Sequence, residues 1–549
     1  MYYTSTRDKS IRISSAEAIT KGISAEGGLF VPTEIPHITL DDIKRIGTLP
    51  YTGRAKEILK LYLTDFTEDE LNYCVEGAYK KSSFSSEKIA PLYKISDKES
   101  ILELWRGPTC AFKDMALQLL PYLLSVSASK TLKDTKIVIL VATSGDTGKA
   151  ALEGFKDVDN TQILVFYPVD GVSPMQKLQM TTQEGNNVSV CAIKGNFDDA
   201  QSGVKSIFTN SEIKKKFAEN HLAFSSANSI NWGRLVPQIV YYVSAYCDMV
   251  ENGSLKLGEE MNVVVPTGNF GNILAAYYAK RMGVPIGKLI CASNSNNVLT
   301  DFLKTGTYDK NRNFYCTASP SMDILISSNL ERLLFHLSGE NDAEVREYMK
   351  LLANSGKYTV GEQLFEKIKE LWPEVYVCPS VDITREWREY ERTSTAVLNA
   401  YVMPVASSYL NRLGQRLTDA GMPENRYIMQ SNGGTTTFEQ AKLTPVNIVE
   451  SGPVAGVFGA SILGKIIGEP NIIAFDVGGT TAKCSLIDQG AVKVTTSYYI
   501  EKDERHAGYP IMAPVVDIVE IGNGGGSIAW IDEGGSLKVG PKSAGALPG

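Results

Sequence analysis

The sequence predicts an α/β protein made of wound α/β subdomains. From about residue 91 onward, short apolar runs typical of strands alternate with longer amphipathic runs typical of helices. Several of the apolar runs pass directly into turns rich in glycine and hydroxyl residues. A similar strand, again followed by a glycine turn, returns at Ile472–Phe475. This alternation indicates sheets covered by helices, with turns at the strand ends that can bind anions.

The composition is that of an ordinary soluble globular protein. The chain has 549 residues, enough for about three or four domains. It is 43% hydrophobic and 21% charged, with a net charge of -7. No basic block and no interleaving of basic and aromatic residues stands out, so nucleic acid is not an expected partner. We expect a small anionic substrate that is held by locally placed cations.

The cysteines and histidines predict no metal site. The eight cysteines contain no CxxC pair, and the four histidines lie far apart. This spacing indicates neither a zinc site nor a disulfide framework, and we expect reduced thiols. The first residues lack the apolar segment of a signal peptide, and no apolar run approaches about 18 residues. We therefore expect a cytoplasmic protein without a membrane-spanning segment.

Residues 1–90 predict a small α/β domain. Leu40–Ile46 and Ala55–Phe66 have the apolar spacing of helices. Asp41 and Asp42 lie near the start of the first of these helices, where the helix dipole favours negative charge. These residues by themselves indicate no chemistry.

A lysine lies between a predicted strand and a predicted helix. Lys113 follows the apolar run Ile101–Leu104 and precedes the amphipathic run Met115–Leu124. Burial disfavours the charged form of a lysine and lowers its pKa. Such an amine is a candidate for Schiff-base chemistry with pyridoxal phosphate. The alternative is a lysine at a helix N-terminus whose amine reaches into water.

The segment around this lysine resembles a known family. Gly107–Gln118 is similar to the lysine motif of threonine synthases, Met1–Pro36 resembles the N-terminal domain of that family, and further matches continue to about residue 355. The resemblance implies a fold-type II pyridoxal-phosphate enzyme, a lyase of threonine biosynthesis that converts O-phosphohomoserine and water into L-threonine and phosphate. It implies that Lys113 forms the Schiff base. Arg106 stands where we expect a histidine, which leaves its role open.

A polar turn follows the predicted strand Ile137–Ala142. The turn precedes the predicted helix Ala150–Phe155, and its N–H groups and the helix dipole could bind an anion. The alternative is an ordinary tight turn between a strand and a helix. By resemblance this is the substrate loop, whose residues would bind the substrate carboxylate and the groups that face the cofactor. These residues are Thr143, Ser144, Gly145, Asp146 and Thr147.

Two further residues are candidates for binding the substrate phosphate. Asn231 and Arg234 lie in a polar segment just before the apolar run Leu235–Tyr246. The planar guanidinium fork suits a phosphate dianion, although a single arginine more often forms a surface ion pair. Lys177 could also meet the phosphate, but a solvated helix residue is an equally good interpretation.

The strongest phosphate-binding turn follows Asn262–Pro266, which predicts a buried strand. Glycines let a backbone approach a phosphate closely, and the following helix, Ile273–Arg281, adds positive potential at its start. The G-x-G-x-x-G spacing of dinucleotide sites is absent. By resemblance, this turn binds the 5′-phosphate of the cofactor. Its residues are Gly268, Asn269, Phe270, Gly271 and Asn272.

A second resemblance begins after the first one ends. From Trp372–Val377 onward, and through the glycine-rich passage Glu520–Ser527, the chain is similar to the A subunit of ATP-dependent hydantoinases and oxoprolinases, over about residues 362–549. The resemblance implies a partial actin-like ATPase-type α/β domain. Asp476 follows a predicted buried strand, Ile472–Phe475, and could hold the hydrated Mg²⁺ of Mg-ATP. The turn around it contains Gly478, Gly479, Thr480 and Thr481. The alternative is a polar hairpin.

These patterns predict a fusion of two incomplete parts. We expect an N-terminal domain at 1–90, a catalytic domain without the family's C-terminal part at 91–355, a junction at 356–375 and a hydantoinase A-like part at 376–549. No earlier D-x-G-G-T turn precedes residue 360, and no Ser/Thr-Pro-Lys-Phe segment of the first family follows residue 355. A gene fusion or an assembly artefact explains this better than an evolved bifunctional enzyme. The alternative function is an ATP-dependent hydantoinase or 5-oxoprolinase fragment.

Overall fold

The computed structural model describes residues 1–96, 98–143, 145–169, 172, 174–195, 197–315, 317, 320–371, 383–384, 388–496, 498–500, 502 and 507–544. Ser144 and Trp372–Val377, singled out above, lie outside these ranges. The chain forms two compact units. Unit 1 comprises Met1–Cys291, Val298–Phe314 and Ser321–Val375, and unit 2 comprises Ala292–Asn297, Tyr315–Pro320 and Tyr376–Gly549. The domain bounds proposed from the sequence stay a prediction.

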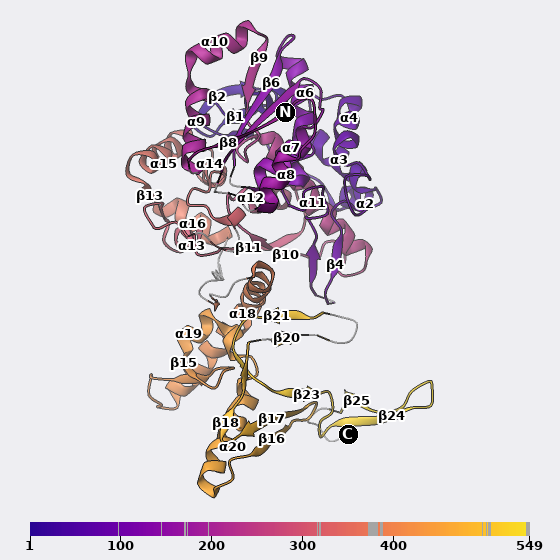
Figure 1. Cartoon of the computed structure of the whole chain (residues 1–549), viewed down its shortest axis with the longest axis vertical. Coiled ribbons are helices and arrows are strands. Elements are labelled where there is room, and N and C mark those ends of the chain that lie inside the picture. Colours follow the sequence, from indigo (N-terminus) through magenta and orange to yellow (C-terminus); the bar gives the residue numbers. More distant parts are fainter. Residues whose placement is uncertain are drawn as a thin grey trace. The chain divides into compact units, whose positions relative to one another are not determined.

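Unit 1 begins with a small antiparallel sheet in the order β2-β1-β3 (Figure 1). Four helices follow or interrupt it, and α1, α2 and α4 each begin with a capping box, in which a Ser or Thr and the acidic residue three positions on satisfy each other's backbone N–H. The second helix predicted here starts four residues earlier than expected and ends at Tyr62 instead of Phe66. The elements are β1 (Tyr3–Ser5), β2 (Asp8–Ile13), α1 (Ser15–Lys21), β3 (Phe30–Pro32), α2 (Leu40–Gly47), α3 (Tyr51–Tyr62) and α4 (Glu68–Ala78).

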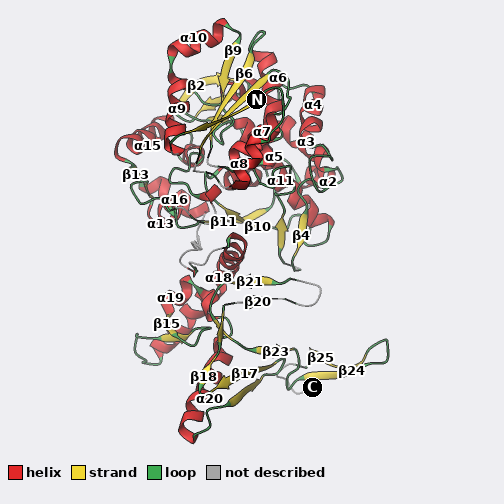
Figure 2. Cartoon of the chain, viewed as in Figure 1, coloured by secondary structure: helices red, strands yellow, loops and turns green. Residues whose placement is uncertain are grey.

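A four-stranded parallel sheet forms the centre of unit 1, in the order β8-β7-β6-β9. Strands and helices alternate along this part of the chain, which confirms the predicted wound α/β architecture (Figure 2). Because all four strands run the same way, the loops after their carboxyl ends meet at one edge. The elements are β6 (Lys136–Ala142), α7 (Asp146–Phe155), β7 (Thr161–Pro168), α8 (Pro174–Thr181), β8 (Val188–Ile193), α9 (Phe197–Thr209), α10 (Ser211–Glu219) and β9 (Leu222–Ser225).

The single helix predicted after Lys113 is two helices, α5 (Asp114–Leu117) and α6 (Leu120–Thr131). Pro121 lies in the first turn of α6, where a missing N–H costs nothing, but in one continuous helix its ring would meet the carbonyl of Leu117. That carbonyl is also close to α7. A Cβ on Gly154 would lie 2.0 Å from the Leu117 oxygen, so only glycine allows α5 and α7 to approach this closely.

The second half of unit 1 is built around the long helix α11, which is buried along most of its length. Aromatic side chains from distant segments pack around Trp232 on this helix, including Tyr3, Tyr62 and Tyr278, with ring centroids 5.4 to 5.5 Å apart. The elements are α11 (Trp232–Glu251), β10 (Met261–Pro266), α12 (Gly271–Arg281), β11 (Ile286–Ala292), α13 (Val298–Thr305), β12 (Thr307–Asp309), η1 (Pro320–Met322), α14 (Leu330–Leu337), α15 (Asp342–Ser355), β13 (Lys357–Thr359) and α16 (Glu362–Leu371).

The predicted buried strand Asn262–Pro266 is only half buried. Within β10, Val265 is 2% exposed, whereas Val264 is 40% exposed. β10 belongs to a two-stranded sheet with β11, and successive side chains of a strand point to opposite faces. One face of this small sheet therefore packs on the core while the other stays open. A hairpin of β4 (Leu92–Lys94) and β5 (Ser100–Leu102) precedes the Lys113 segment.

Unit 2 is built around a small antiparallel sheet of β16, β17, β18 and β23, with helix α20 on one face. The elements are α18 (Glu389–Asp419), β14 (Tyr427–Met429), β15 (Thr435–Thr437), α19 (Phe438–Leu443), η2 (Pro445–Ile448), α20 (Ser451–Ile467), β16 (Ile472–Val477), β17 (Ala482–Asp488), β18 (Ala491–Val492), β19 (Val494–Thr495), β20 (Tyr498–Ile500), β21 (Tyr509–Ile511), β22 (Val515–Val516), β23 (Val519–Ile521), β24 (Ser527–Ile531) and β25 (Leu537–Ser543). Over the described residues, no helix is both long and apolar enough to cross a membrane.

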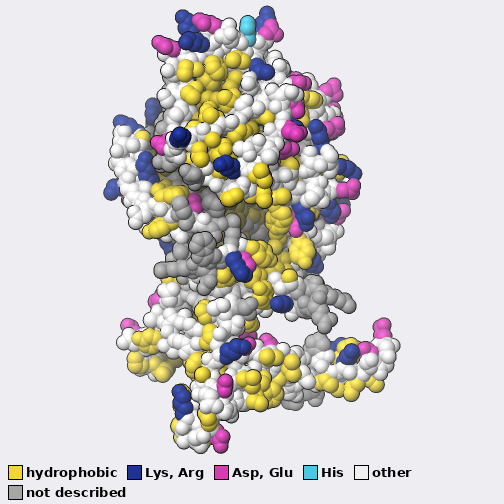
Figure 3. Space-filling view, viewed as in Figure 1, with side chains coloured by type: hydrophobic (Ala, Val, Ile, Leu, Met, Phe, Trp, Pro, Cys, Tyr) yellow, Lys and Arg dark blue, Asp and Glu magenta, His cyan; other side chains and the backbone are white. Residues whose placement is uncertain are grey.

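The prediction that Ile472–Phe475 is a buried strand is wrong. Ile472 packs against the core cluster that contains Val457 of α20, but the next residue, Ile473, is 67% exposed and Phe475 is 66% exposed. Exposed hydrophobic side chains gather over this part of unit 2 in the view of Figure 3. The physical reason is that α20 covers only one face of the sheet, and alternate residues of a strand face opposite ways.

Candidate functional site

The Lys113 segment is held in place by the residue that follows the lysine. Asp114 is fully buried and accepts hydrogen bonds from the Thr109 backbone N–H at 2.8 Å and the Thr109 hydroxyl at 2.7 Å. Gly107 is needed here because a Cβ at this position would lie 2.5 Å from the Asp114 Cβ. This closed loop ends at Lys113, which directly precedes α5. The amine is buried, since the Lys113 side chain is 9% exposed, so the alternative of a lysine that reaches into water does not apply.

Burial makes the Lys113 amine easier to deprotonate. Loss of solvation is the largest cause and lowers the pKa of Lys113 to about 8, and Arg234 and Lys149 also lower it. Asp146 acts in the opposite direction, because its carboxylate lies 3.8 Å from Lys113 Nζ. An amine with this pKa can both hold and release a proton near neutral pH.

Asp146 is the first residue of α7, and several groups keep it ionised. Burial alone would raise its pKa, but Lys113, a hydroxyl hydrogen bond from Ser321 and the Lys149 amine at 3.3 Å lower the pKa of Asp146 to about 2. Gln176 Nε2 also donates to this carboxylate at 3.0 Å. The sequence pattern gave no role to Ser321 or Gln176, because each comes from a separate segment. Together they point the Asp146 carboxylate at the lysine.

Three other residues of the predicted substrate loop, Thr143, Gly145 and Thr147, lie beside Asp146. Thr143 is buried, and its Oγ1 accepts hydrogen bonds from the N–H groups of Gly145 and Gly148, both at 3.0 Å. Gly145 has a φ of 151°, and a Cβ there would lie 2.4 Å from Gln176. Thr147 is half-buried in the first turn of α7. Because a carboxylate repels another carboxylate, backbone N–H groups of this loop suit a substrate carboxylate better than the Asp146 side chain does.

The predicted phosphate turn lies close to the same site. A Cβ on Gly268 would be 3.3 Å from the Met322 Cα, and the neighbouring Ser321 binds Asp146. The turn ends at Phe270, which precedes α12 with a φ of 63°, a conformation that is uncommon outside glycine. The side chain of Asn272 accepts hydrogen bonds from two buried tyrosines of α11, with 2.8 Å to Tyr242. That amide therefore supports the packing of α11 on α12.

The two predicted phosphate ligands on α11 have different surroundings. Asn231 is fully buried and caps the helix: Oδ1 accepts from Gly233 N at 2.9 Å, and Nδ2 donates to the carbonyls of Ile19 at 3.0 Å and Ser226 at 2.8 Å. These bonds give the Asn231 side chain a structural role. Its direct contact with a phosphate stays a prediction.

Arg234 is a buried cation beside the lysine. Its side chain donates to the Ala227 carbonyl at 2.9 Å, and burial lowers the pKa of Arg234 to about 10. Among the residues that the structure describes, no carboxylate forms an ion pair with it. A buried charge is costly without an opposite charge, so this environment favours a bound anion. By contrast, Lys177 is exposed, and Arg106 forms an ion pair with Glu103 at 2.6 Å.

The predicted nucleotide turn of unit 2 is the tip of a hairpin. Residues 478–481 connect β16 and β17, which pair antiparallel. The Gly478 and Gly479 carbonyls accept hydrogen bonds from Gly525 N at 2.9 Å and Gly526 N at 2.7 Å. This geometry is that of a polar hairpin, which is the alternative interpretation of the segment. A nucleotide role stays a prediction for Asp476, Gly478, Gly479, Thr480 and Thr481.

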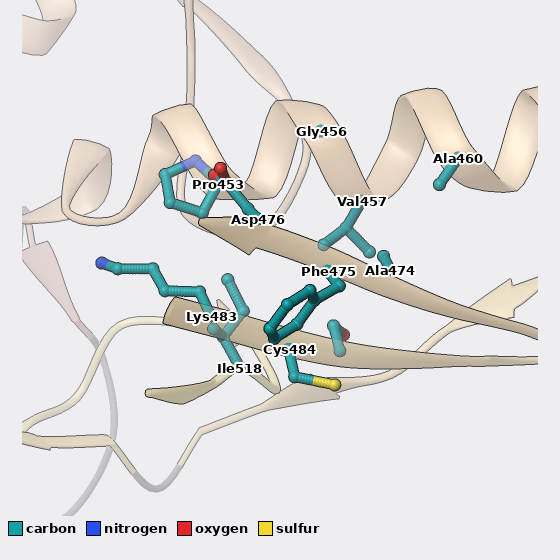
Figure 4. A pocket seen from close by; sticks show the side chains of 11 residues that line it. Pro453, Gly456, Val457, Ala460, Ala474, Phe475, Asp476, Lys483, Cys484 and Ile518 are labelled. Carbon is teal, nitrogen blue, oxygen red and sulfur yellow. The ribbon is translucent and has the colours of Figure 1, made fainter. Parts of the chain in front are cut away.

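A pocket of about 240 Å³ lies between α20 and the strands of this hairpin (Figure 4). Asp476 of β16 and Lys483 of β17 lie opposite each other in the antiparallel strand pair. Lys483 forms ion pairs with Glu450 and, at 3.6 Å, with Glu520. The lining residues are Pro453, Gly456, Val457, Ala460, Ala474, Phe475, Asp476, Lys483, Cys484, Ser485 and Ile518. Within the described ranges, no three His, Cys, Asp or Glu residues cluster as a metal site would require.

Comparison with known proteins divides the chain in the same way as its motifs. Residues 2–79 match the family model "Threonine synthase N terminus", residues 101–363 match "Pyridoxal-phosphate dependent enzyme", and residues 392–549 match "Hydantoinase/oxoprolinase". Both predicted resemblances are confirmed.

The similar proteins include enzymes whose structures are solved. Threonine synthase of Pseudomonas aeruginosa is 39% identical over 381 residues, which is 69% of this chain and 77% of that protein. Threonine synthase-like 1 of Homo sapiens is 41% identical over 365 residues, or 65% of this chain. This chain spans about half the length of that relative, 49%. The pyridoxal-phosphate-bound threonine synthase structure from Brucella melitensis is 38% identical with a TM-score of 0.64, covering 70% of this chain and 79% of that one.

Proposed function

From the premise that this chain belongs to the threonine synthase family, we propose that unit 1 is a pyridoxal-phosphate-dependent lyase that converts O-phosphohomoserine and water into L-threonine and phosphate. The observation that carries this proposal is the buried Lys113 amine, held 3.8 Å from an ionised Asp146. A lysine whose amine reaches into water would have neither the nearby carboxylate nor the burial that Lys113 has.

The residues present fit pyridoxal phosphate. The Gly268–Asn272 segment includes the start of α12, where backbone N–H groups and the helix dipole suit a phosphate. Glycine at position 268 leaves the backbone of this turn uncrowded, since a Cβ there would already be 3.1 Å from the Ile324 side chain. When bound, the cofactor supplies an aldehyde that joins an amine and a ring that takes up electrons from a deprotonated carbon. Lys113 would hold it covalently and the turn would hold its phosphate.

The chain's own groups then have distinct tasks. The Lys113 amine, with a pKa of about 8, would remove a proton from the substrate Cα and return one later, after phosphate has left Cγ and water has added at Cβ. The Asp146 carboxylate orients that amine and stabilises it when it is protonated. Arg234 is suited to the substrate phosphate, which is the leaving group, because its planar fork matches a phosphate dianion. The ligand is thus a small phosphorylated amino acid.

The test is covalent trapping on the full chain. Purified protein is mixed with pyridoxal phosphate, reduced with borohydride and digested, and the modified peptide is identified by mass spectrometry. We expect the label on Lys113, and release of inorganic phosphate from O-phosphohomoserine by the untreated protein. Lys113→Ala should lose both the label and the phosphate release, whereas Lys177→Ala, a change at an exposed lysine, should keep both. A label found elsewhere, or kept in Lys113→Ala, would contradict the proposal.

A second candidate function belongs to unit 2. Its match to the hydantoinase/oxoprolinase family supports an ATP-dependent hydrolase fragment with Mg-ATP near Asp476. We expect weak binding at most, because the N–H groups of Gly525 and Gly526 already bind the turn. Calorimetry with Mg-ATP decides this: micromolar binding that Asp476→Asn removes would support the second function.

The cytoplasmic location stays a prediction.

A further inference from the structure

Arg332 is a buried cation that binds two distant segments of unit 1 and the N-cap residue of its own helix, α14. Its Nε donates to the Phe30 carbonyl at 3.0 Å, its Nη2 donates to the Ile230 carbonyl at 2.6 Å, and its Nη1 donates to Asn329 Oδ1. The side chain is fully buried, and burial lowers the pKa of Arg332 to about 10. No carboxylate in the described part of the chain forms an ion pair with it. Its charge is therefore stabilised mainly by carbonyl oxygens.

One of these contacts reaches the helix that carries Arg234. Ile230, whose carbonyl Arg332 binds, directly precedes Asn231, the capping residue of α11. Arg234 lies in the first turn of that helix, and its own backbone N–H donates to the Asn231 carbonyl at 3.0 Å. By fixing the Ile230 carbonyl, Arg332 sets where α11 begins and hence where the Arg234 side chain starts.

A second contact reaches the phosphate turn through Asn329. The Asn329 N–H donates to the Asn269 carbonyl at 3.2 Å, and the Ser327 hydroxyl donates to the Gly268 carbonyl at 2.7 Å. In a trans peptide, the C=O of one residue and the N–H of the next point in opposite directions. Holding these two carbonyls on the Ser327–Asn329 side therefore turns the N–H groups of Asn269 and Phe270 to the other side of the turn.

Asn329 is itself fixed by close packing. It is fully buried, its Nδ2 donates to the Ser229 carbonyl at 3.2 Å, and Arg332 binds its Oδ1. A Cβ on Gly271 would lie 3.2 Å from the same Nδ2, so glycine at the start of α12 leaves room for this amide. The contact between Arg332 and the turn thus passes through one immobilised residue, whose side chain binds Arg332 and whose backbone N–H binds Asn269.

We propose that Arg332 is a positioning residue for phosphate binding: its guanidinium holds the start of α11, which carries Arg234, and the Gly268–Asn272 turn in register with each other. Each of the three guanidinium nitrogens of Arg332 already donates to a protein oxygen, so in this proposal it acts without contacting the substrate or the cofactor. The inference rests on the proposed function and extends it to a residue that acts through other groups.

A purely structural arginine and a positioning arginine predict different losses. If Arg332 only stabilises the fold, its replacement weakens the binding of every ligand alike. If it positions the phosphate-binding groups, its replacement weakens ligands that carry a phosphate much more than ligands that lack one. Pyridoxal phosphate and pyridoxal differ only by that phosphate, so the ratio of their dissociation constants reports the positioning directly.

The experiment measures this ratio on the full chain, by absorbance titration and by borohydride trapping at Lys113. The variants are Arg332→Met, which removes all three hydrogen bonds, and Arg332→Lys, which keeps the charge but loses the fork. A third variant, Asn329→Ala, removes the side-chain hydrogen bonds with Arg332 and Ser229 and so uncouples Arg332 from the residue whose backbone N–H binds the turn. We expect each to reduce the preference for pyridoxal phosphate by about ten-fold or more, because small displacements of binding groups are costly. Circular dichroism checks that each variant is folded.

Arg7→Met is the matched control. Arg7 forms a bidentate ion pair with Glu331, the neighbour of Arg332, at 2.8 and 2.7 Å, and so anchors the same helix without contacting the turn or the start of α11. The Arg7→Met variant should be less stable than the unsubstituted chain but should keep its preference for pyridoxal phosphate over pyridoxal. If Arg332→Met fails to fold, Arg332→Lys and Asn329→Ala decide, and an unchanged preference in these two overturns the inference. If the unsubstituted chain shows no preference or no trapping at Lys113, the proposed function itself is contradicted.

Discussion

Replacing Asp146 by asparagine should make the Lys113 amine more acidic. The substitution removes the negative charge that lies 3.8 Å from Lys113 Nζ and leaves the shape of the side chain nearly unchanged. At this distance two unit charges interact by about 1 kcal/mol at the dielectric constant of water and by about 4 kcal/mol at an effective constant of about 20. The Asp146 side chain is 23% exposed and the lysine is buried, so the value lies between these limits.

One pKa unit corresponds to about 1.4 kcal/mol. Asp146 raises the pKa of Lys113, which stands at about 8. Its loss should therefore move the pKa of Lys113 to about 7 or below. In this variant burial, Arg234 and Lys149 still act on the amine, all in the lowering direction. More of the amine would then be neutral at pH 7.

The assay is competitive acetylation of the chain without cofactor. Trace labelling at a series of pH values gives the fraction of neutral amine at each lysine, and mass spectrometry reads Lys113 and the exposed Lys177 in the same sample. The Lys113 midpoint should lie near pH 8 in the unsubstituted chain and at least about one pH unit lower in Asp146→Asn.

Ser321→Ala is the control, because it removes a hydrogen bond to Asp146 but keeps the carboxylate. Its Lys113 midpoint should move much less than in Asp146→Asn, because the negative charge is still present. An unchanged or raised midpoint in Asp146→Asn would refute the electrostatic reasoning, since it would mean that the carboxylate does not act on the lysine.

Three other predictions test the same region. Gly154→Ala places a Cβ 2.0 Å from the Leu117 oxygen and should lower the free energy of unfolding by about 1 to 3 kcal/mol in urea titrations. Gly203→Ala, whose Cβ would meet no atom of the described residues within 4 Å, should stabilise slightly, and equal effects would argue against the close packing of α5 on α7. Arg234→Met should raise the KM for O-phosphohomoserine at least about ten-fold, and an unchanged KM in steady-state kinetics would exclude phosphate binding by this residue. The pKa of Asp146 is about 2, below its value in an unfolded chain, so its contribution to stability is present above about pH 4 and is lost as the pH falls toward 2; melting curves of Asp146→Asn should lack this part of the acid dependence.

The elements that sequence reasoning located best are those with a strong local pattern. The strand predicted at Ile137–Ala142 and the helix predicted at Ile273–Arg281 start within two residues of the predicted positions, because strand and helix periodicity are properties of adjacent residues. The error at Met115–Leu124 has a local cause, Pro121, that apolar periodicity does not register. The errors at Val264 and Phe475 have a different cause. An apolar run shows that a strand can be buried, but the layer that covers it comes from elsewhere in the chain.

Motifs located the site, but they did not assign every side chain its role. Lys113 and Arg234 could be named from their sequence neighbours, and both prove to be buried cations. Asn231 and Asn272 also belong to recognisable motifs, yet their side chains cap a helix and bind tyrosines. A motif shows that a residue type is required at a position. It does not distinguish contact with a ligand from support of the groups that make that contact.

The sequence alone determined that two unrelated families meet in one chain, that Lys113 is the reactive amine to test, and which turns can bind anions. Only the tertiary structure decided that Asp146 lies near Lys113, that Ser321 donates a hydrogen bond to this carboxylate, and that Arg332 binds both the residue before α11 and Asn329 beside the Gly268–Asn272 segment. The physical reason is the separation along the chain of the residues that interact. Strands, helices and turns arise from interactions between near neighbours, whereas the protonation of a buried amine depends on charges brought within a few ångströms by the packing of distant segments.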